Sequence, residues 1–173
     1  MTERPFVHVV VVDHDGGPLT LACLHSLVAS DWPADRLRIV CVDNASAVNS
    51  LGHSPALIAE TLAARLPEVQ VIRSEVNRGF AGGANLGLRA RGDADFVALV
   101  NNDATVDPGW LEPLVATFTR APDIGAACPK ILLADPTVEI VVEAPTHRPG
   151  RDDGRARGVR VGGARVGGPD GDD

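Results

Sequence analysis

Four polar segments of the sequence each follow an apolar run, and their side chains are of the kinds that hold phosphate and metal ions. They are Asp13-His14-Asp15, Asp43-Asn44, Asn77-Arg78-Gly79 and Asn101-Asn102-Asp103. Carboxylates repel a diphosphate unless a cation lies between them, and Mg²⁺ or Mn²⁺ is commonly held by one or two carboxylates plus substrate phosphates. The segments therefore predict a site for a diphosphate and a divalent cation, with Asp103 as the natural metal ligand.

Two common nucleotide-binding motifs do not fit the sequence. A P-loop ends in Gly-Lys-Ser/Thr, whereas the only lysine, Lys130, lies far from any glycine-rich loop. A dinucleotide-binding fold needs Gly-x-Gly-x-x-Gly directly after its first strand, but the turn here offers only Gly16-Gly17 among acidic residues that would repel a pyrophosphate. Neither P-loop chemistry nor a nicotinamide cofactor is expected.

Alternating strands and helices are expected to position the four segments. The β-branched run at 6–12 is typical of a strand that is covered on both faces of a parallel sheet. Further strands are expected at 37–42, 69–73 and 96–100, a fifth strand or extended segment at 124–128, and helices at 18–30, 56–66, 110–118 and from the glycine-rich segment 77–87 to about residue 90. This alternation predicts a doubly wound α/β sheet, in which ligands bind outside the carboxyl ends of the strands.

Length, composition and charge limit the class of protein. A chain of 173 residues with 45% hydrophobic and 23% charged residues suits one globular domain. Its net charge of −7 argues against nucleic acid as a partner, and no apolar run approaches the roughly 20 residues of a membrane-spanning helix. Cys23, Cys41 and Cys128 stand alone in apolar surroundings, which predicts reduced, buried thiols and a cytoplasmic location.

Four segments in this order resemble the family 2 glycosyltransferases of GT-A fold, in particular their rhamnosyltransferase-like branch. They are 9–17, 42–46, 77–87 and 99–103, the last followed by Pro108-Gly109-Trp110-Leu111, and the resemblance covers residues 6–135. It implies a GT-A-type, doubly wound, mostly parallel sheet flanked by helices. It also implies transfer of a hexosyl or rhamnosyl group from a nucleotide-diphosphate donor to an acceptor hydroxyl.

The same resemblance implies roles for individual residues. Asp43 would contact the nucleotide base or its ribose, and His14 takes the position where the family often has an aromatic residue against the base. Asp103 would be the metal-binding carboxylate for Mg²⁺ or Mn²⁺, whereas Asn101 departs from the first Asp of the family's Asp-x-Asp motif and leaves one charge fewer for the metal. The remaining substrate-binding residues would be Arg78, Gly82, Gly83, Asn85 and Asn102.

An inverting transfer also needs a general base that takes the proton of the acceptor hydroxyl. In the family this Asp or Glu belongs to a second half beyond the donor-binding half, and we expect this chain to end before it. The catalytic base therefore stays unassigned, and either the chain is truncated or a partner chain supplies the acceptor half. Residues 1–135 are expected to form the nucleotide-sugar-binding domain. Residues 136–173, rich in Gly, Arg and Asp, are expected to be a partial continuation and a flexible tail.

Two other functions compete with glycosyl transfer. One is a catalytically inactive nucleotide-sugar-binding or split-enzyme module that needs a partner chain. The other is a nucleotidyltransferase of similar architecture, which would carry a glycine-rich, basic loop after its first strand. The acidic segment 13–15 argues against this last function.

Overall fold

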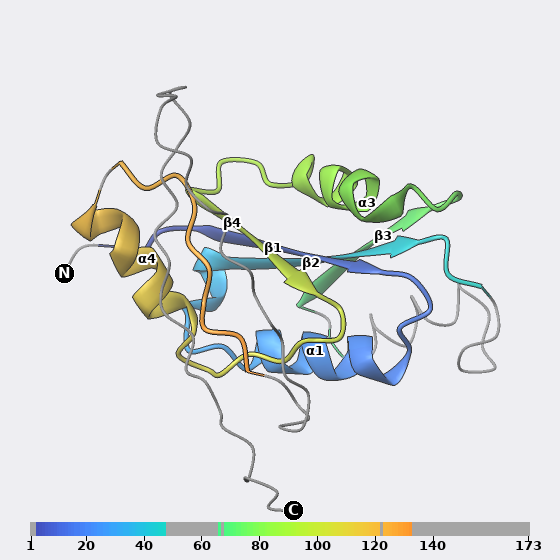
Figure 1. Ribbon diagram of the computed structural model, residues 1–173, viewed down its shortest axis with the longest axis horizontal. Coiled ribbons are helices and arrows are strands. Elements are labelled where there is room, and N and C mark those ends of the chain that lie inside the picture. Colours follow the sequence, from blue (N-terminus) through green and yellow to red (C-terminus); the bar gives the residue numbers. More distant parts are fainter. Residues whose placement is uncertain (1–2, 48–65, 67, 122, 133–173) are drawn as a thin grey trace, which may run out of the picture. The chain divides into compact units, whose positions relative to one another are not determined.

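The computed structural model describes residues 3–47, 66, 68–121 and 123–132 (Figure 1). The chain divides into two compact units, Met1–Leu111 and Glu112–Asp173, and the sheet belongs to the first. Residues 56–65 of the expected second helix and the expected tail at 136–173 lie outside the described residues.

Strands and helices alternate through the described residues of the first unit. Its elements are β1 (Val7–Asp13), α1 (Pro18–Val28), a short 3-10 helix (Ala34–Arg36), β2 (Leu37–Asn44), β3 (Val69–Ser74), α3 (Gly79–Leu88) and β4 (Phe96–Asn101). The helix α4 (Leu111–Arg120) begins at the last residue of this unit and lies otherwise in the second. The strands lie where the β-branched and apolar runs of the sequence predict them.

The sheet is parallel throughout, with the strand order β3-β2-β1-β4. The chain moves outward from β1 through β2 to β3 and then returns to pair β4 with the other side of β1. The strand order therefore reverses between β1 and β4, with α3 on one face of the sheet and α1 on the other (Figure 1). In doubly wound folds the carboxyl ends of the strands at such a reversal form the crevice in which ligands bind.

Valines of the inner strands form the core, and α3 packs closely onto them. Val9 and Val11 of β1 are completely buried. A Cβ atom added to Gly87 would lie 2.5 Å from Cγ1 of Val10, and one added to Gly83 would lie 2.6 Å from Cγ1 of Val12. These glycines allow the helix to approach the sheet, and this close packing fixes the helix end that reaches the carboxyl ends of the strands.

The structure decides between two alternatives for residues 124–128 and corrects one expectation about the cysteines. Residues 124–128 were expected to form a fifth strand or an extended segment, and among the described residues they pair with no strand. Cys128 is exposed, whereas Cys23 and Cys41 are buried free thiols as predicted. The described residues form no helix that is both long enough and apolar enough to cross a membrane.

Candidate functional site

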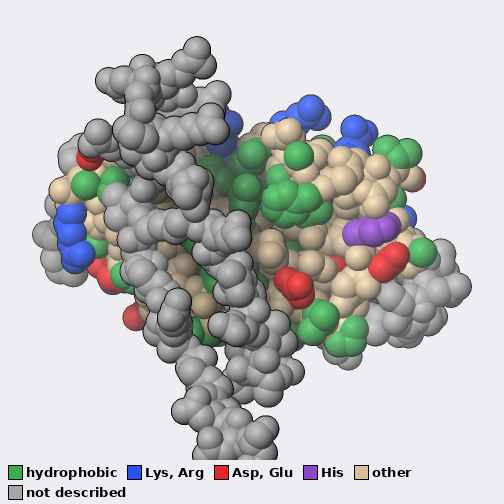
Figure 2. Space-filling model, viewed as in Figure 1, with side chains coloured by type: hydrophobic (Ala, Val, Ile, Leu, Met, Phe, Trp, Pro, Cys, Tyr) green, Lys and Arg blue, Asp and Glu red, His purple; other side chains and the backbone are tan. Residues whose placement is uncertain are grey.

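The carboxyl ends of three strands bring the polar segments to one edge of the sheet. Asp13 lies opposite Asp43 in the pairing of β1 with β2, and Val12 lies opposite Asn101 in the pairing of β1 with β4. We call this edge the strand-end rim and define it as residues 13–17, 43–47, 77–79 and 101–103. Figure 2 shows a histidine and acidic side chains gathered on this edge.

Asp13 is the most heavily bonded side chain of the strand-end rim. Its carboxylate is buried, and Oδ1 accepts hydrogen bonds from the backbone N–H of Gly16 at 3.1 Å, the hydroxyl of Thr20 at 2.6 Å and the amide of Asn102 at 3.1 Å. The other oxygen, Oδ2, accepts from the hydroxyl of Ser46 at 3.3 Å. One carboxylate thus joins the segments that follow β1, β2 and β4.

The loops after β1 and β2 are also linked directly. The backbone N–H of Asp15 donates to Oγ of Ser46 at 3.0 Å, and the backbone N–H of Ala47 donates to Oδ1 of Asp15 at 2.7 Å. Both loops contain a non-glycine residue in the left-handed region, with φ of 56° at Asp15 and 63° at Ala45. Such conformations are costly and persist where surrounding contacts hold them.

Asn44 connects the end of β2 to the start of α3. Its amide donates to Oδ1 of Asn77 at 3.0 Å and to the carbonyl of Gly79 at 3.2 Å, while its Oδ1 accepts from the backbone N–H of Arg78 at 2.9 Å. Oδ1 of Asn77 also accepts from the backbone N–H of Gly79 at 2.8 Å. These bonds place the positive N-terminal end of the α3 dipole at the strand-end rim.

The carboxylate of Asp43 is buried, and each of its two oxygens binds another residue of the protein. Its Oδ1 accepts from the backbone N–H of Ser46 at 2.9 Å, which closes the turn after β2, and its Oδ2 forms an ion pair with the guanidinium of Arg73 on β3. Asp43 therefore has a structural role in the described residues in addition to the ligand role that the sequence predicts for it.

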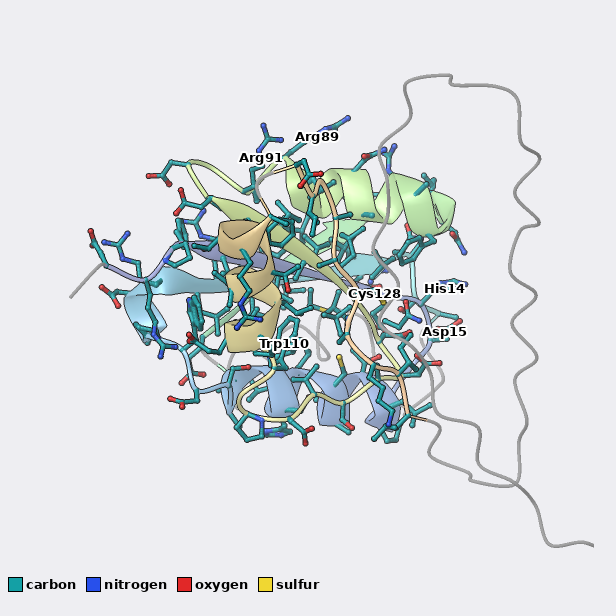
Figure 3. The ribbon with its side chains drawn as sticks, turned by 60° about the vertical axis from the view of Figure 1, so that its left-hand side comes forward. His14, Asp15, Arg89, Arg91, Trp110 and Cys128 are labelled. Atoms are coloured by element: carbon teal, nitrogen blue, oxygen red, sulfur yellow. The ribbon has the colours of Figure 1, made fainter. Side chains whose placement is uncertain are left out.

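His14 and Asp15 project from the loop after β1 (Figure 3). The His14 side chain is 45% exposed, and its Nε2 lies 3.9 Å from Oδ2 of Asp15. Because the residues on both sides of His14 are anchored by hydrogen bonds, its imidazole is presented from a restrained backbone. An exposed ring of this kind is available to a planar group that binds at the strand-end rim.

In the segment after β4, Asn102 is held by hydrogen bonds, whereas the carboxylate of Asp103 is exposed. The amide of Asn102 donates to Oδ1 of Asp13 and, at 3.1 Å, to the hydroxyl of Thr20. Asp103, the next residue, is exposed, and no hydrogen bond or ion pair joins its carboxylate to another described residue. The anchoring of Asn102 therefore limits the directions in which the Asp103 carboxylate can point.

A divalent cation fits this donor set if a substrate supplies its other ligands. Asp103 offers one available carboxylate and Asn101, also exposed, a neutral amide, which suits a cation held largely by phosphates and water. The nearby thiol of Cys23 is not a ligand candidate, because burial, aided by the charge of Asp103, raises the pKa of Cys23 to about 11 and keeps it protonated. Among the described residues no group of three or more His, Cys, Asp or Glu side chains is arranged to hold a metal ion.

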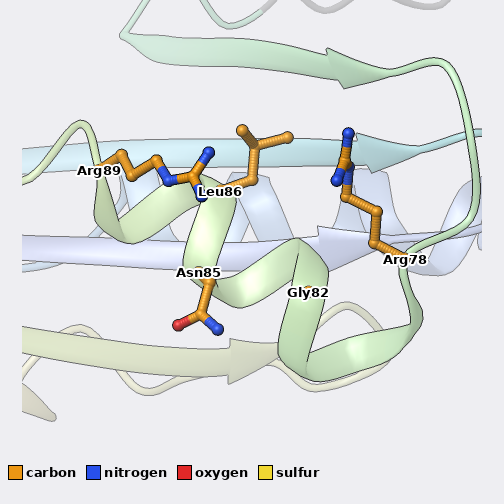
Figure 4. Close-up of a pocket in the computed structure, with 5 residues that line it drawn as sticks. All are labelled: Arg78, Gly82, Asn85, Leu86 and Arg89. Atoms are coloured by element: carbon orange, nitrogen blue, oxygen red, sulfur yellow. The ribbon is translucent and has the colours of Figure 1, made fainter.

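The predicted residues of α3 occupy different faces of that helix. Arg78, Gly82, Asn85, Leu86 and Arg89 line a shallow pocket of about 380 Å³. Asn85 points to the opposite side of the helix from Leu86 and Arg89 (Figure 4). Nε of Arg78 donates to Oγ of Ser74 at 3.0 Å, so this guanidinium stays near the end of β3. Gly83 is buried against the sheet, and its part in the site would be to let the helix approach.

The structure thus brings His14, Asp43, Asn102 and Asp103 together on the strand-end rim, with Arg78 at the start of α3. The sequence placed Asp13 in a polar segment of the predicted site, but it indicated no individual role for the three residues that hold the strand-end rim together, which are Asp13, Thr20 and Ser46. Their sequence offers one signal, an aspartate at a strand end three residues before a glycine, which is compatible with a simple turn. Its partners lie up to 89 residues away along the chain, so only the fold identifies them.

Comparisons with known proteins agree with this geometry. Residues 8–149 match the model of glycosyl transferase family 2. No curated protein sequence matches the chain. Among solved structures, the mannosyltransferase PcManGT from Pyrobaculum calidifontis, in complex with GDP-Man and Mn²⁺, is 28% identical with a TM-score of 0.63, and the match covers 75% of this chain and 37% of that one.

Two further solved structures show the fold at lower identity. Residues 1–349 of S. aureus TarS in complex with UDP are 22% identical with a TM-score of 0.56, over 72% of this chain and 38% of that one. GalNAc-T7 with UDP, GalNAc and Mn²⁺ is 22% identical with a TM-score of 0.59, over 69% of this chain and 22% of that one. The chain therefore spans less than two fifths of each of these proteins. With a GT-A sheet and a family match over most of its length, this chain belongs to glycosyl transferase family 2.

Proposed function

We propose that this chain binds a nucleoside diphosphate sugar together with a divalent cation at the strand-end rim. We propose further that it provides the donor site for transfer of that sugar, with inversion, to an acceptor hydroxyl. The observation that carries this proposal is the exposed Asp103 carboxylate beside the anchored Asn102, at the point where the strand order reverses. A cation held there would balance the charge that develops on a leaving diphosphate.

The similar structures support the chemical class of the ligand. PcManGT was solved with GDP-Man and Mn²⁺, and TarS with UDP and with UDP-GlcNAc. Each of these ligands is a nucleoside diphosphate or its sugar ester. By its resemblance to the rhamnosyltransferase-like branch we propose a hexose or rhamnose as the transferred sugar.

Each residue of the site has a proposed role. Asp103 holds the Mg²⁺ or Mn²⁺ ion, His14 lies against the base, and Asp43, supported by Arg73, contacts the base or ribose. The positive end of α3, fixed by Asn44, favours the diphosphate. The other proposed donor contacts come from Arg78, Gly82, Gly83, Asn85 and Asn102.

A donor-binding module without transfer activity is the second candidate. It is favoured because the Asp13 and Asp43 carboxylates of the strand-end rim are buried and bonded to other residues of the protein. We propose that residues 1–135 act as this donor-binding part and that residues 136–173 continue beyond it. A partner chain would then supply the acceptor half. The buried free thiols Cys23 and Cys41 support a reducing compartment such as the cytoplasm.

Titration calorimetry with UDP, GDP and dTDP, each with and without Mn²⁺, tests the proposed donor site. We expect at least one of them to bind only when Mn²⁺ is present. Replacement of a carboxylate that holds the cation should cost at least as much as removal of a residue that merely orients a ligand, so Asp103→Ala is expected to weaken Mn²⁺-dependent binding by at least about tenfold.

Asp107→Ala is the matched control, since Asp107 is also an exposed aspartate in the segment after β4. This variant is expected to bind the nucleotide as the wild type does. Equal affinities of the wild type and Asp103→Ala would contradict the metal assignment, and failure of every nucleotide to bind the wild type would contradict the proposed function.

A further inference from the structure

We propose that Asp13 is a positioning residue, whose buried carboxylate fixes the segment that presents Asp103 to the cation. This inference rests on the proposed function, because it concerns how the donor site is held in shape. It extends that function to a residue that has no direct contact with the ligand. Asp13 is 6% exposed, and its two oxygens together accept four hydrogen bonds.

The link from Asp13 to the segment after β4 is the basis of the proposal. Asn102 donates to Oδ1 of Asp13 and to the hydroxyl of Thr20, so its side chain has two fixed partners on β1 and α1. Asp103 follows directly in the sequence and is exposed. Because Asn102 is held from inside the protein, the backbone that carries the Asp103 carboxylate is held as well.

The crowding around Gly16 shows that this arrangement has little freedom. A Cβ atom added to Gly16 would lie 2.1 Å from Nδ2 of Asn102, 2.3 Å from Oγ1 of Thr20 and 2.7 Å from Oδ1 of Asp13. The turn after β1 therefore closes directly over the hydrogen bonds of Asp13. Enclosed in this way, the carboxylate orients its neighbours and cannot itself reach the cation.

The second oxygen of Asp13 also fixes the position of the loop after β2. Oγ of Ser46 donates to Oδ2 of Asp13 and accepts from the backbone N–H of Asp15, the residue after His14. One side chain therefore sets the relative positions of the segments that carry His14 and Asp103. A buried carboxylate is costly to desolvate, and its hydrogen bonds to several loops give it a role that an apolar residue cannot replace.

The experiment measures the affinity for Mn²⁺ in the presence of saturating UDP or GDP, by calorimetry and by the electron paramagnetic resonance of free Mn²⁺. Removal of a residue that orients a metal ligand typically lowers metal affinity by about 10–100-fold, and we expect this loss for Asp13→Ala. Asp13→Asn keeps an oxygen that can accept the bonds made to Oδ1, so it is expected to retain most of the affinity.

Two further variants separate positioning from general stability. Val40→Ala removes part of a completely buried core side chain away from the strand-end rim and serves as a control with lowered melting temperature. Thr20→Val replaces a buried hydroxyl that binds both Asp13 and Asn102 by a group of the same shape, and is expected to weaken Mn²⁺ binding several-fold. If Asp13→Ala does not fold, Mn²⁺ binding by Thr20→Val tests the positioning role instead.

The outcomes distinguish this inference from the proposed function. If the wild type binds and Asp13→Ala loses no more affinity than Val40→Ala, Asp13 is only a stabilising residue and the inference is overturned. Equal losses in Asp13→Asn and Asp13→Ala would also overturn it, since the negative charge rather than the geometry would then matter. If the wild type itself binds no nucleotide with Mn²⁺, the proposed function is contradicted. The donor-site role of Asp13 is then contradicted as well, because it depends on that function.

Discussion

The side chains of Asp43 and Asn102 combine a predicted ligand role with a structural one. The sequence shows a carboxylate and an amide at strand ends, which are the places where ligands bind. In the structure, Asp43 is paired with Arg73 and Asn102 with Asp13. Replacement of either by alanine would leave a polar partner unsatisfied, so the effects on binding and on stability must be measured separately.

His8 is a buried histidine at the other end of β1. Its Nε2 lies 3.1 Å from the carbonyl of Gly87 in the last turn of α3, and no described residue forms a hydrogen bond with its Nδ1. Burial lowers the pKa of His8 below its usual value of 6.5, opposed by the bond to Gly87 and assisted by the charges of Arg38 and Arg91. The imidazole is therefore neutral in the folded protein at neutral pH.

This lowered pKa predicts that the protein becomes less stable as the solution is acidified through pH 6.5. The unfolded chain takes up a proton at His8 near its usual pKa of 6.5, whereas the folded protein resists protonation until a lower pH. The contribution of His8 to stability is therefore complete above pH 6.5 and is lost as the pH falls toward the folded pKa. Urea unfolding at pH 7.5 and 5.5 should show a smaller decrease for His8→Leu than for the wild type.

The exposed His25 of α1 provides the control for this comparison. His25→Gln removes a histidine without disturbing the contact between β1 and α3. An equally large decrease in the wild type and in His8→Leu would show that other groups cause the pH dependence.

At the scale of elements, the contact between α3 and the sheet depends on glycine. In Gly87→Ala the new Cβ would lie 2.5 Å from Cγ1 of Val10 and 3.1 Å from Cγ2 of Val42. Overpacking of this kind costs about 1–3 kcal/mol, partly offset by the higher helix propensity of alanine, about 1 kcal/mol. We expect a net loss of about 1 kcal/mol in the free energy of unfolding, measured by urea denaturation.

Gly109→Ala is the matched substitution, because a Cβ at Gly109 meets no atom within 4 Å. Its effect is expected to stay within about 0.5 kcal/mol, as for most surface substitutions. If the two variants were equally stable, α3 would not be packed against Val10 as described.

The order of elements could be predicted from the sequence because periodicity is a local property. The β-branched run that forms β1 and the polar segments after β1, β2 and β4 gave the strands and the strand-end rim correctly. The direction that each side chain takes could not be predicted, since it depends on contacts distant in sequence. The bond between Asp13 and Asn102 joins residues 89 apart, and the burial of Gly83 on the side of α3 that faces Val12 depends on the packing of the helix onto the sheet.

For the whole molecule, we expect donor binding without efficient transfer by this chain alone. A general base must lie within about 3 Å of the proton that it removes. On the strand-end rim, Asp13 and Asp43 are buried and bonded, Asp15 accepts from Ala47, and Asp103 is assigned to the cation. Purified protein incubated with nucleotide sugars and a panel of acceptors is therefore expected to release little nucleoside diphosphate.

Calorimetry on the same preparation is the necessary control, because it shows whether the donor site is intact when turnover is low. The assay with chelator instead of Mn²⁺ gives the background. Rapid, metal-dependent release by this chain would show that a base is already present, and it would decide against the donor-binding module as the function.

The backbone conformation of Ala45 lowers the stability of the strand-end rim, and this strain affects which residues suit position 45. Its φ of 63° is unfavourable for any residue with a Cβ atom by about 1–2 kcal/mol, whereas glycine adopts it freely. A change to glycine would relieve that strain in the folded state but would widen the range of conformations open to the turn between Asp43 and Ser46. Selection for heat resistance and selection for tight ligand binding would therefore favour different residues at position 45, a local form of the trade-off between stability and activity.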